Sequence, residues 1–195
     1  MVVKLNEFHS AMPTVYRGVN LKSRLEAQCA FLLDALGMAW DYEPKSYMLP
    51  NGVAYLPDFW VERQRMYVEC RGYQNERGAS QIEQFGLDVV QGQVGPEGRS
   101  ILRYVALQDE DVRCYRPRHE GYAEGCLATR CAGCDAWAMM GFGDFRCPTC
   151  LENGTSITTA FVVGVKAGKI LLNGVNSEHW DGLLLGSVSD PAERV

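Results

Sequence analysis

Residues 55–72, YLPDFWVERQRMYVECRG, contain two apolar segments joined by a polar turn. Their aromatic and β-branched residues predict two strands, one over 53–61 and one over 66–71. If a two-residue loop joins them, Asp58 on the first strand lies directly opposite Glu69 on the second. Both carboxylates then project from the same face of the sheet, because only a one-residue shift of register would move either of them to the other face.

The second strand also carries a positive charge beside these acids. Side chains two residues apart share a face, so Arg71 lies beside Glu69, while Cys70 points to the other face and offers its backbone carbonyl. Two carboxylates and a carbonyl are oxygen ligands that suit Mg²⁺, which fills the rest of its shell with water and substrate. A bound divalent cation activates water, and a second positive charge stabilises the phosphate as it reacts. These residues could therefore supply the groups that phosphodiester hydrolysis needs.

A helix is expected upstream of these strands. Asn20 is a suitable N-cap, and apolar residues at helical spacing continue to Leu36, where Gly37 ends the helix. Glu26 lies beside the apolar face of this helix. Lys22 precedes Glu26 by four residues, so both side chains can reach the same site.

The rest of the chain completes an α/β pattern with an accessory module. The expected elements are a helix over 80–90, a strand over 100–107 and a hairpin over 157–175. A strand, helix and strand in this order are typical of a core with a mixed sheet. The polar segment before residue 119 suggests two domains, a core over 1–118 and a smaller module over 119–195.

Four of the eight cysteines form two CxxC pairs separated by twelve residues. Two such pairs supply four thiolates at the spacing of a tetrahedral Zn²⁺ site, so the segment resembles a zinc ribbon. The ligands would be Cys131, Cys134, Cys147 and Cys150. A redox role for the CxxC pairs is the alternative, and Cys126 is a further candidate ligand. The ribbon could be purely structural or could contact nucleic acid.

The acids and their flanking sequences resemble the PD-(D/E)xK nuclease superfamily. The helix KSRLEAQCAFLLDALG, the strand YLPDFWV and the strand YVECRGY are similar to small phage and transposon-associated nucleases over roughly residues 16–107. The resemblance implies a restriction-endonuclease-like core and a metal-dependent DNA endonuclease. It implies that Asp58, Glu69 and the Cys70 carbonyl ligate Mg²⁺ or Mn²⁺. Glu26 would ligate a second metal or hold a metal-bound water.

The third motif ends in Arg71 where the family usually has lysine. Arginine stays protonated, so it can stabilise a phosphate but cannot relay a proton. Three possibilities follow. Arg71 acts only electrostatically, or a lysine elsewhere has taken the role of the family's lysine, or catalysis has been lost. Lys22 is the first candidate for such a lysine and Lys45 a weaker one. If catalysis has been lost, the chain would be a nuclease-like nucleic-acid-binding or assembly subunit.

The charge and hydropathy of the chain limit which classes of partner it can have. The formal net charge is −5, from 19 basic and 24 acidic residues, which argues against a uniformly basic DNA-binding surface. Residues 61–118 nevertheless hold nine arginines against nine acids, and arginine binds phosphate well. No apolar run approaches the ~18 residues of a membrane span, and no signal peptide is recognisable. We therefore expect a cytoplasmic protein. Its expected partner is nucleic acid, with DNA favoured over RNA. A homodimer or a protein partner is also possible.

Overall fold

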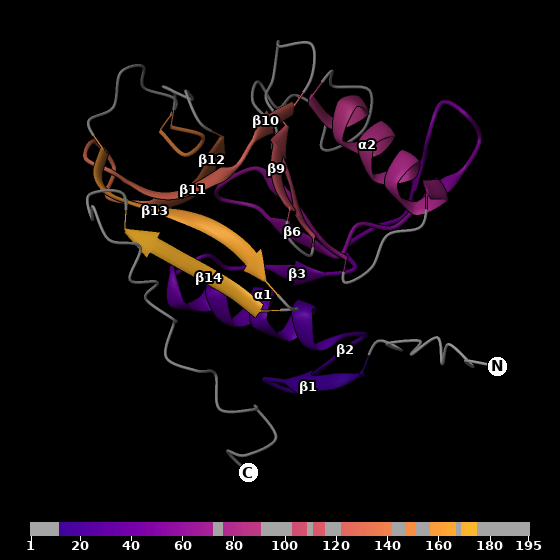
Figure 1. Cartoon of the computed structure of the whole chain (residues 1–195), viewed down its shortest axis with the longest axis horizontal. Helices are drawn as coiled ribbons and strands as arrows, with labels where there is room; N and C mark the ends of the chain where they lie inside the picture. Colours follow the sequence, from indigo (N-terminus) through magenta and orange to yellow (C-terminus); the bar gives the residue numbers. More distant parts are fainter. Residues whose placement is uncertain are drawn as a thin grey trace, which may run out of the picture.

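The structure is a computed structural model, and it describes residues 12–71, 76–90, 103–108, 111–115, 122–141, 147–150, 157–166 and 169–174. Within these residues the chain forms two helices and four sheets (Figure 1). The two largest sheets have six and four strands, and each of the two others is a two-stranded hairpin. The combination agrees with the expected α/β class.

The six-stranded sheet has the order β10-β9-β8-β7-β6-β3. Its strands are β3 (Asp41–Tyr42), β6 (Phe59–Val61), β7 (Met66–Arg71), β8 (Arg103–Gln108), β9 (Asp111–Tyr115) and β10 (Tyr122–Glu124). The β7–β8 pair is parallel and the other pairs are antiparallel, so the sheet is mixed, as expected. Helix α2 (Glu76–Val90) makes the parallel crossover from β7 to β8, which needs a connection of this length.

The hairpin of β6 and β7 has the register on which the site depends. Phe59 pairs with Val68, and the same register continued by one residue places Asp58 opposite Glu69. A tight turn over 62–65 allows this register, since the Arg65 N–H donates to the Glu62 carbonyl at 3.1 Å. The predicted two-residue loop is therefore confirmed.

The strand expected over 53–61 is broken into two pieces. β5 (Ala54–Tyr55) pairs with β4 (Tyr47–Met48) in a separate hairpin, and β6 starts only at Phe59. Pro57 separates the pieces, because proline has no N–H to donate to a ladder. The break carries Asp58 out of the regular strand, next to the end of β7.

The helix predicted over 20–36 starts later than expected. Helix α1 spans Arg24–Ala35, and its N-cap is Ser23, whose Oγ accepts a hydrogen bond from the Glu26 N–H at 3.1 Å. Asn20 lies instead in β2 (Val19–Leu21), which pairs with β1 (Thr14–Tyr16). Arg17 and Gly18 turn this hairpin, both with positive φ.

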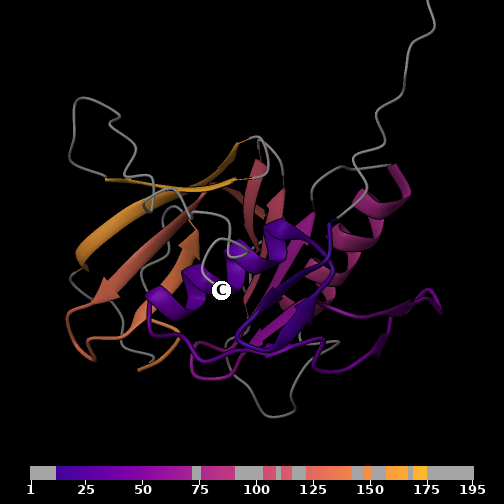
Figure 2. The ribbon, with the colours of Figure 1, turned by 90° about the horizontal axis from the view of Figure 1, so that it is seen from below.

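The four-stranded sheet packs against the first helix. Its order is β12-β11-β13-β14, with β11 (Cys126–Cys131), β12 (Trp137–Gly141), β13 (Ile157–Lys166) and β14 (Lys169–Gly174). Figures 1 and 2 show α1 lying alongside this sheet and the six-stranded sheet. Its apolar residues share one buried cluster with Val68 of β7, Ala128 of β11 and Val163 of β13. The expected hairpin near 157–175 is thus present, as β13 and β14.

Polar contacts also join the segments on either side of the predicted boundary near residue 118. The Gln28 side chain in α1 accepts a hydrogen bond from the Ile170 N–H at 2.9 Å. The Gln64 side chain donates to the Trp137 carbonyl at 3.1 Å. β10, which follows that boundary, pairs with β9 in the six-stranded sheet. The two segments therefore share a core.

Candidate functional site

Three of the sequence-predicted acids are buried. The exposed fractions are 5% for Glu26, 8% for Asp58 and 0% for Glu69. Ionised carboxylates are almost never buried to this extent unless they are paired or bind a metal. These acids are therefore not members of solvated helix or strand faces.

Asp58 and Glu69 are linked across the hairpin through the backbone. The Asp58 Oδ2 atom accepts from the Cys70 N–H at 2.7 Å, and the Glu69 Oε2 atom accepts from the Asp58 N–H at 3.4 Å. The first contact brings the Asp58 carboxylate to the backbone of residue 70, whose carbonyl is the third predicted ligand, and the second brings the Glu69 carboxylate to the backbone of Asp58. The structure thus brings Asp58 and Glu69 together across the hairpin, and their role as metal ligands stays a prediction.

The electrostatics of this pair are unfavourable without a cation. Burial and the neighbouring Glu69 carboxylate raise the pKa of Asp58 well above its usual range. Burial raises the pKa of Glu69 to about 7, although Arg71 and Tyr55 oppose the rise. Two buried carboxylates this close cannot both ionise easily, and a divalent cation would relieve the repulsion.

Glu26 approaches Asp58 from the other side of the sheet. Helix α1 covers the face of β7 that carries Val68, whereas Glu69 belongs by alternation to the face of Tyr67. Glu26 is near enough to Asp58 to raise its pKa further. Among the described residues, however, only the four cysteines gather three or more ligand atoms within 4.8 Å of one another. Glu26 therefore does not share one compact ligand set with Asp58 and Glu69.

The carboxylate of Glu26 also caps the helix. Its Oε1 atom accepts from the Ser23 hydroxyl at 2.9 Å, and its Oε2 atom accepts from the Lys22 N–H at 2.8 Å and the Tyr42 hydroxyl at 2.6 Å. This is a variant of the capping box, which explains its burial without a metal. A role toward a second metal or a bound water stays a prediction.

Arg71 lies directly on the acid pair. Its guanidinium contacts the Glu69 Oε1 atom at 2.6 Å while 45% of its side chain is exposed, so it faces both the acids and solvent. Burial lowers the pKa of Arg71, but Glu69, Tyr55 and Asp58 raise it more, so the guanidinium stays charged. Arg71 is therefore positioned to receive an anion from solvent.

The two candidate lysines are placed differently. The Lys22 Nζ atom pairs with Glu43, and this contact, against the opposing effect of burial, raises its pKa, with smaller contributions from Asp58 and Glu26. Lys45 lies over the ring of Tyr47, 5.7 Å from its centroid. Lys22 is thus close to the acids but already has a carboxylate partner.

Sequence reasoning missed two tyrosines that hold the acids. Tyr42 donates to Glu26, and Tyr55 is hydrogen-bonded to Glu69. Both come from the segment between α1 and β6, where tyrosines recur at 42, 47 and 55. This recurrence was the only available signal, because the pairing of each hydroxyl depends on tertiary contacts.

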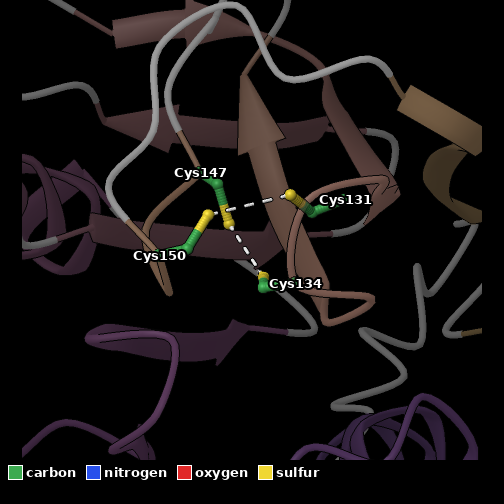
Figure 3. Close-up of side chains that lie close together, drawn as sticks. All are labelled: Cys131, Cys134, Cys147 and Cys150. Carbon is green, nitrogen blue, oxygen red and sulfur yellow. Dashed lines mark hydrogen bonds between the residues drawn. The ribbon is translucent and has the colours of Figure 1, made fainter.

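The four cysteines of the CxxC pairs converge (Figure 3). The Sγ atoms of Cys131 and Cys150 are 3.9 Å apart, and those of Cys134 and Cys147 are 3.7 Å apart. Tetrahedral ligands at ~2.3 Å from one ion lie about 3.8 Å from each other. The cluster can therefore hold a metal ion, and its dimensions are compatible with zinc.

The backbone around the cluster favours the thiolate of Cys131, whereas burial and the neighbouring thiols raise the pKa of Cys134. Burial raises the pKa of Cys131, but hydrogen bonds from the backbone N–H groups of Cys134 and Gly133 lower it to about 7. The Thr149 N–H donates to the Cys147 sulfur at 3.4 Å. Cys126 is buried in β11 and does not belong to the described cluster. The four cysteines of the motif are thus the residues that could hold a metal ion.

The raised pKa values predict how the stability of the metal-free protein depends on pH. A buried acid whose folded pKa exceeds its unfolded pKa stabilises the fold fully below the unfolded pKa, and this contribution is lost as the pH rises through the folded pKa. The pKa of Glu69 rises from 4.5 to about 7, so its contribution to stability is lost between about pH 4.5 and 7. Asp58→Asn keeps an acceptor for the Cys70 N–H and removes one charge. We expect it to exceed wild type in unfolding free energy by about 1–3 kcal/mol at pH 8, with a smaller difference at pH 5.

The measurement is thermal unfolding of the purified protein without added Mg²⁺ or Mn²⁺. Asp41→Asn, at an exposed position in β3, is the control. An Asp58→Asn variant that is less stable than wild type at pH 8 contradicts the electrostatic interpretation of the pair.

No helix among the described residues is long and apolar enough to cross a membrane. Comparisons of the chain with family models, curated proteins and solved structures find no significant match. The functional argument therefore depends on the chemistry of the acid pair and the cysteine cluster.

Proposed function

We propose that this chain is a Mg²⁺- or Mn²⁺-dependent nuclease of the PD-(D/E)xK kind that cleaves DNA. One observation carries the proposal: two buried carboxylates, Asp58 and Glu69, are linked across the β6–β7 hairpin, and the Arg71 guanidinium lies against Glu69. A buried acid pair that raises its own pKa and has a half-exposed cation next to it is typical of a catalytic site rather than of a stabilising contact.

Each residue has a defined part in this reaction. Asp58, Glu69 and the Cys70 carbonyl would hold the divalent cation. When bound there, the cation activates a water molecule and neutralises a phosphate oxygen. Arg71 pairs with the Glu69 Oε1 atom. If a cation were bound at Glu69 instead, the guanidinium would be free to bind the phosphate and to stabilise its developing charge.

We propose further that Cys131, Cys134, Cys147 and Cys150 bind Zn²⁺ as a structural site. All four thiols would ligate the ion, so no coordination position is left for a substrate. Cys131 is the last residue of β11, and the sheet that contains β11 packs against α1, which carries Glu26. Zinc would thereby support the helix that flanks the acid pair.

A second candidate function is a nuclease-like nucleic-acid-binding or assembly subunit. Arg71 favours this second function, because the PD-(D/E)xK family usually has lysine at this position and arginine cannot relay a proton. An inactive protein that still binds nucleic acid would support this alternative.

The test is cleavage by purified protein of a mixed set of duplex, single-stranded and branched DNA and of RNA. We expect cleavage in Mg²⁺ or Mn²⁺ of at least one DNA form and none without a divalent cation. Absence of cleavage of every substrate in both metals rejects the nuclease proposal.

Substitution of Arg71 tests its role directly. Arg71→Ala should lower the single-turnover rate about 100- to 1,000-fold, because one transition-state donor is lost. Mn²⁺ affinity, measured by calorimetry, should not fall, since Glu69 loses a competing cation. Arg71→Lys should retain or raise activity. Lys22→Ala is the discriminating variant: if it is inactive while Arg71→Ala cleaves at the wild-type rate, Lys22 supplies the catalytic charge.

A further inference from the structure

Tyr55 contacts both halves of the Glu69–Arg71 ion pair. Its hydroxyl donates to the Glu69 carboxylate and accepts a hydrogen bond from the Arg71 guanidinium. Arg71 and Glu69 also touch directly, at 2.6 Å. The three side chains therefore form a closed cluster with the phenol oxygen between an acid and a cation.

The ring of Tyr55 is held rigidly. It is 5% exposed and stacks on Phe85 of α2, with ring centroids 4.5 Å apart and planes inclined by 22°. Phe85 is completely buried and also contacts Tyr47 and Tyr67. Because the ring cannot shift without disturbing this cluster, the position of the hydroxyl is fixed.

A hydroxyl in this position acts on both neighbours. Donation to Glu69 leaves the phenol oxygen free to accept from Arg71, so the two contacts are compatible. If a cation were bound at Glu69 in place of Arg71, the contact between Arg71 and Tyr55 would remain. The guanidinium then keeps a partner at the edge of the site and stays near the metal.

We propose that Tyr55 is a positioning residue, which orients Glu69 for the divalent cation and retains Arg71 beside it for the phosphate. The proposal rests on the proposed function, and it adds a third element to the site, the β4–β5 hairpin. Tyr55 itself touches neither the cation nor the reacting atoms.

The experiment compares Tyr55→Phe with Tyr47→Phe. Both variants keep the ring and lose a hydroxyl from the same aromatic cluster, but Tyr47 contacts only the Tyr67 hydroxyl, at 2.6 Å, in that cluster's described hydrogen bonds. Tyr55→Phe should lower kcat about 10- to 100-fold in saturating Mn²⁺, as expected for a lost hydrogen bond to charged groups. KM for the nucleic acid should change less than about threefold. Tyr47→Phe should change neither.

Mn²⁺ affinity separates this proposal from the proposed function. Calorimetric titration should show weaker Mn²⁺ binding in Tyr55→Phe than in Tyr47→Phe, with similar melting temperatures, whether or not the protein cleaves nucleic acid. Equal Mn²⁺ affinities and equal kcat values in the two variants overturn the positioning role and leave the nuclease proposal intact. If wild type binds Mn²⁺ more tightly than Tyr55→Phe does but cleaves no nucleic acid, only the nuclease proposal is overturned. A wild-type protein that binds no Mn²⁺ overturns both.

Discussion

Asp58→Ala is expected to abolish Mn²⁺ binding at the acid pair and all metal-dependent cleavage. Asp58 is the central residue of the site. Its carboxylate accepts a hydrogen bond from the Cys70 N–H, and the charges of both Glu69 and Glu26 raise its pKa. Its removal takes away one ligand. Loss of the metal should cost more than the ~2.7–4 kcal/mol of a single transition-state donor, so the rate should fall by more than about 1,000-fold. Calorimetry and single-turnover cleavage measure the two effects.

The variant should still fold, because a buried negative charge is lost rather than gained. Asp41→Ala, in the neighbouring β3 strand, is the matched control and should bind Mn²⁺ and cleave as wild type does. Wild-type Mn²⁺ affinity in Asp58→Ala contradicts the proposed ligand set. A loss of cleavage with intact Mn²⁺ binding would move Asp58 from the metal to another role.

Loss of the zinc ligands should have the largest effect on stability. Zn²⁺ binding to four-cysteine or related structural sites contributes about 10–16 kcal/mol, comparable to the whole stability of a domain. Cys147→Ser should therefore lose zinc and unfold the four-stranded sheet of β12, β11, β13 and β14. Because this sheet shares its core with α1, we expect the melting temperature of the whole protein to fall by more than about 10 °C.

Zinc content is measured by elemental analysis and unfolding by circular dichroism. Cys126→Ala is the matched control, because Cys126 is buried in the same strand as Cys131 and is not part of the described cluster. It should keep one zinc per chain and lose only about 1 kcal/mol. Purified wild-type protein without zinc, or a disulfide within either CxxC pair, contradicts the zinc proposal and favours the redox alternative.

Local sequence patterns predicted the parts of the fold that depend on neighbouring residues. The β6–β7 hairpin, its register and the convergence of the cysteines follow from alternation, turn length and ligand spacing. The N-cap of α1 was misplaced because Asn20 and Ser23 are both good caps, and only the β1–β2 pairing shows which one is used. β9 and β10 were not predicted because they are short, with five and three residues, and lie in a charged, polar segment that contains Pro117.

Tertiary packing decided what the sequence left open in the site. The sequence predicted that Glu26 lies near the other acids. It did not predict that Glu26 caps the helix, because one of its hydrogen bonds comes from Tyr42, which is distant in sequence. Likewise Tyr55 reaches Glu69 only because the β4–β5 hairpin folds onto α2 through Phe85. Contacts between segments of this kind are not encoded in any short motif.

The most direct test of the proposed nuclease site is the single-turnover cleavage rate of zinc-loaded protein as a function of Mn²⁺ concentration, on the DNA form that wild type cleaves best. The wild-type rate should rise from zero and saturate at the Mn²⁺ concentration at which calorimetry shows the site to be filled. Asp58→Asn and Glu69→Gln should give no rise at any concentration, whereas Asp41→Asn should follow wild type. A wild-type protein that cleaves at the same rate without Mn²⁺ or Mg²⁺, or an Asp58→Asn variant that saturates as wild type does, would contradict the assignment of Asp58 and Glu69 as the catalytic metal site.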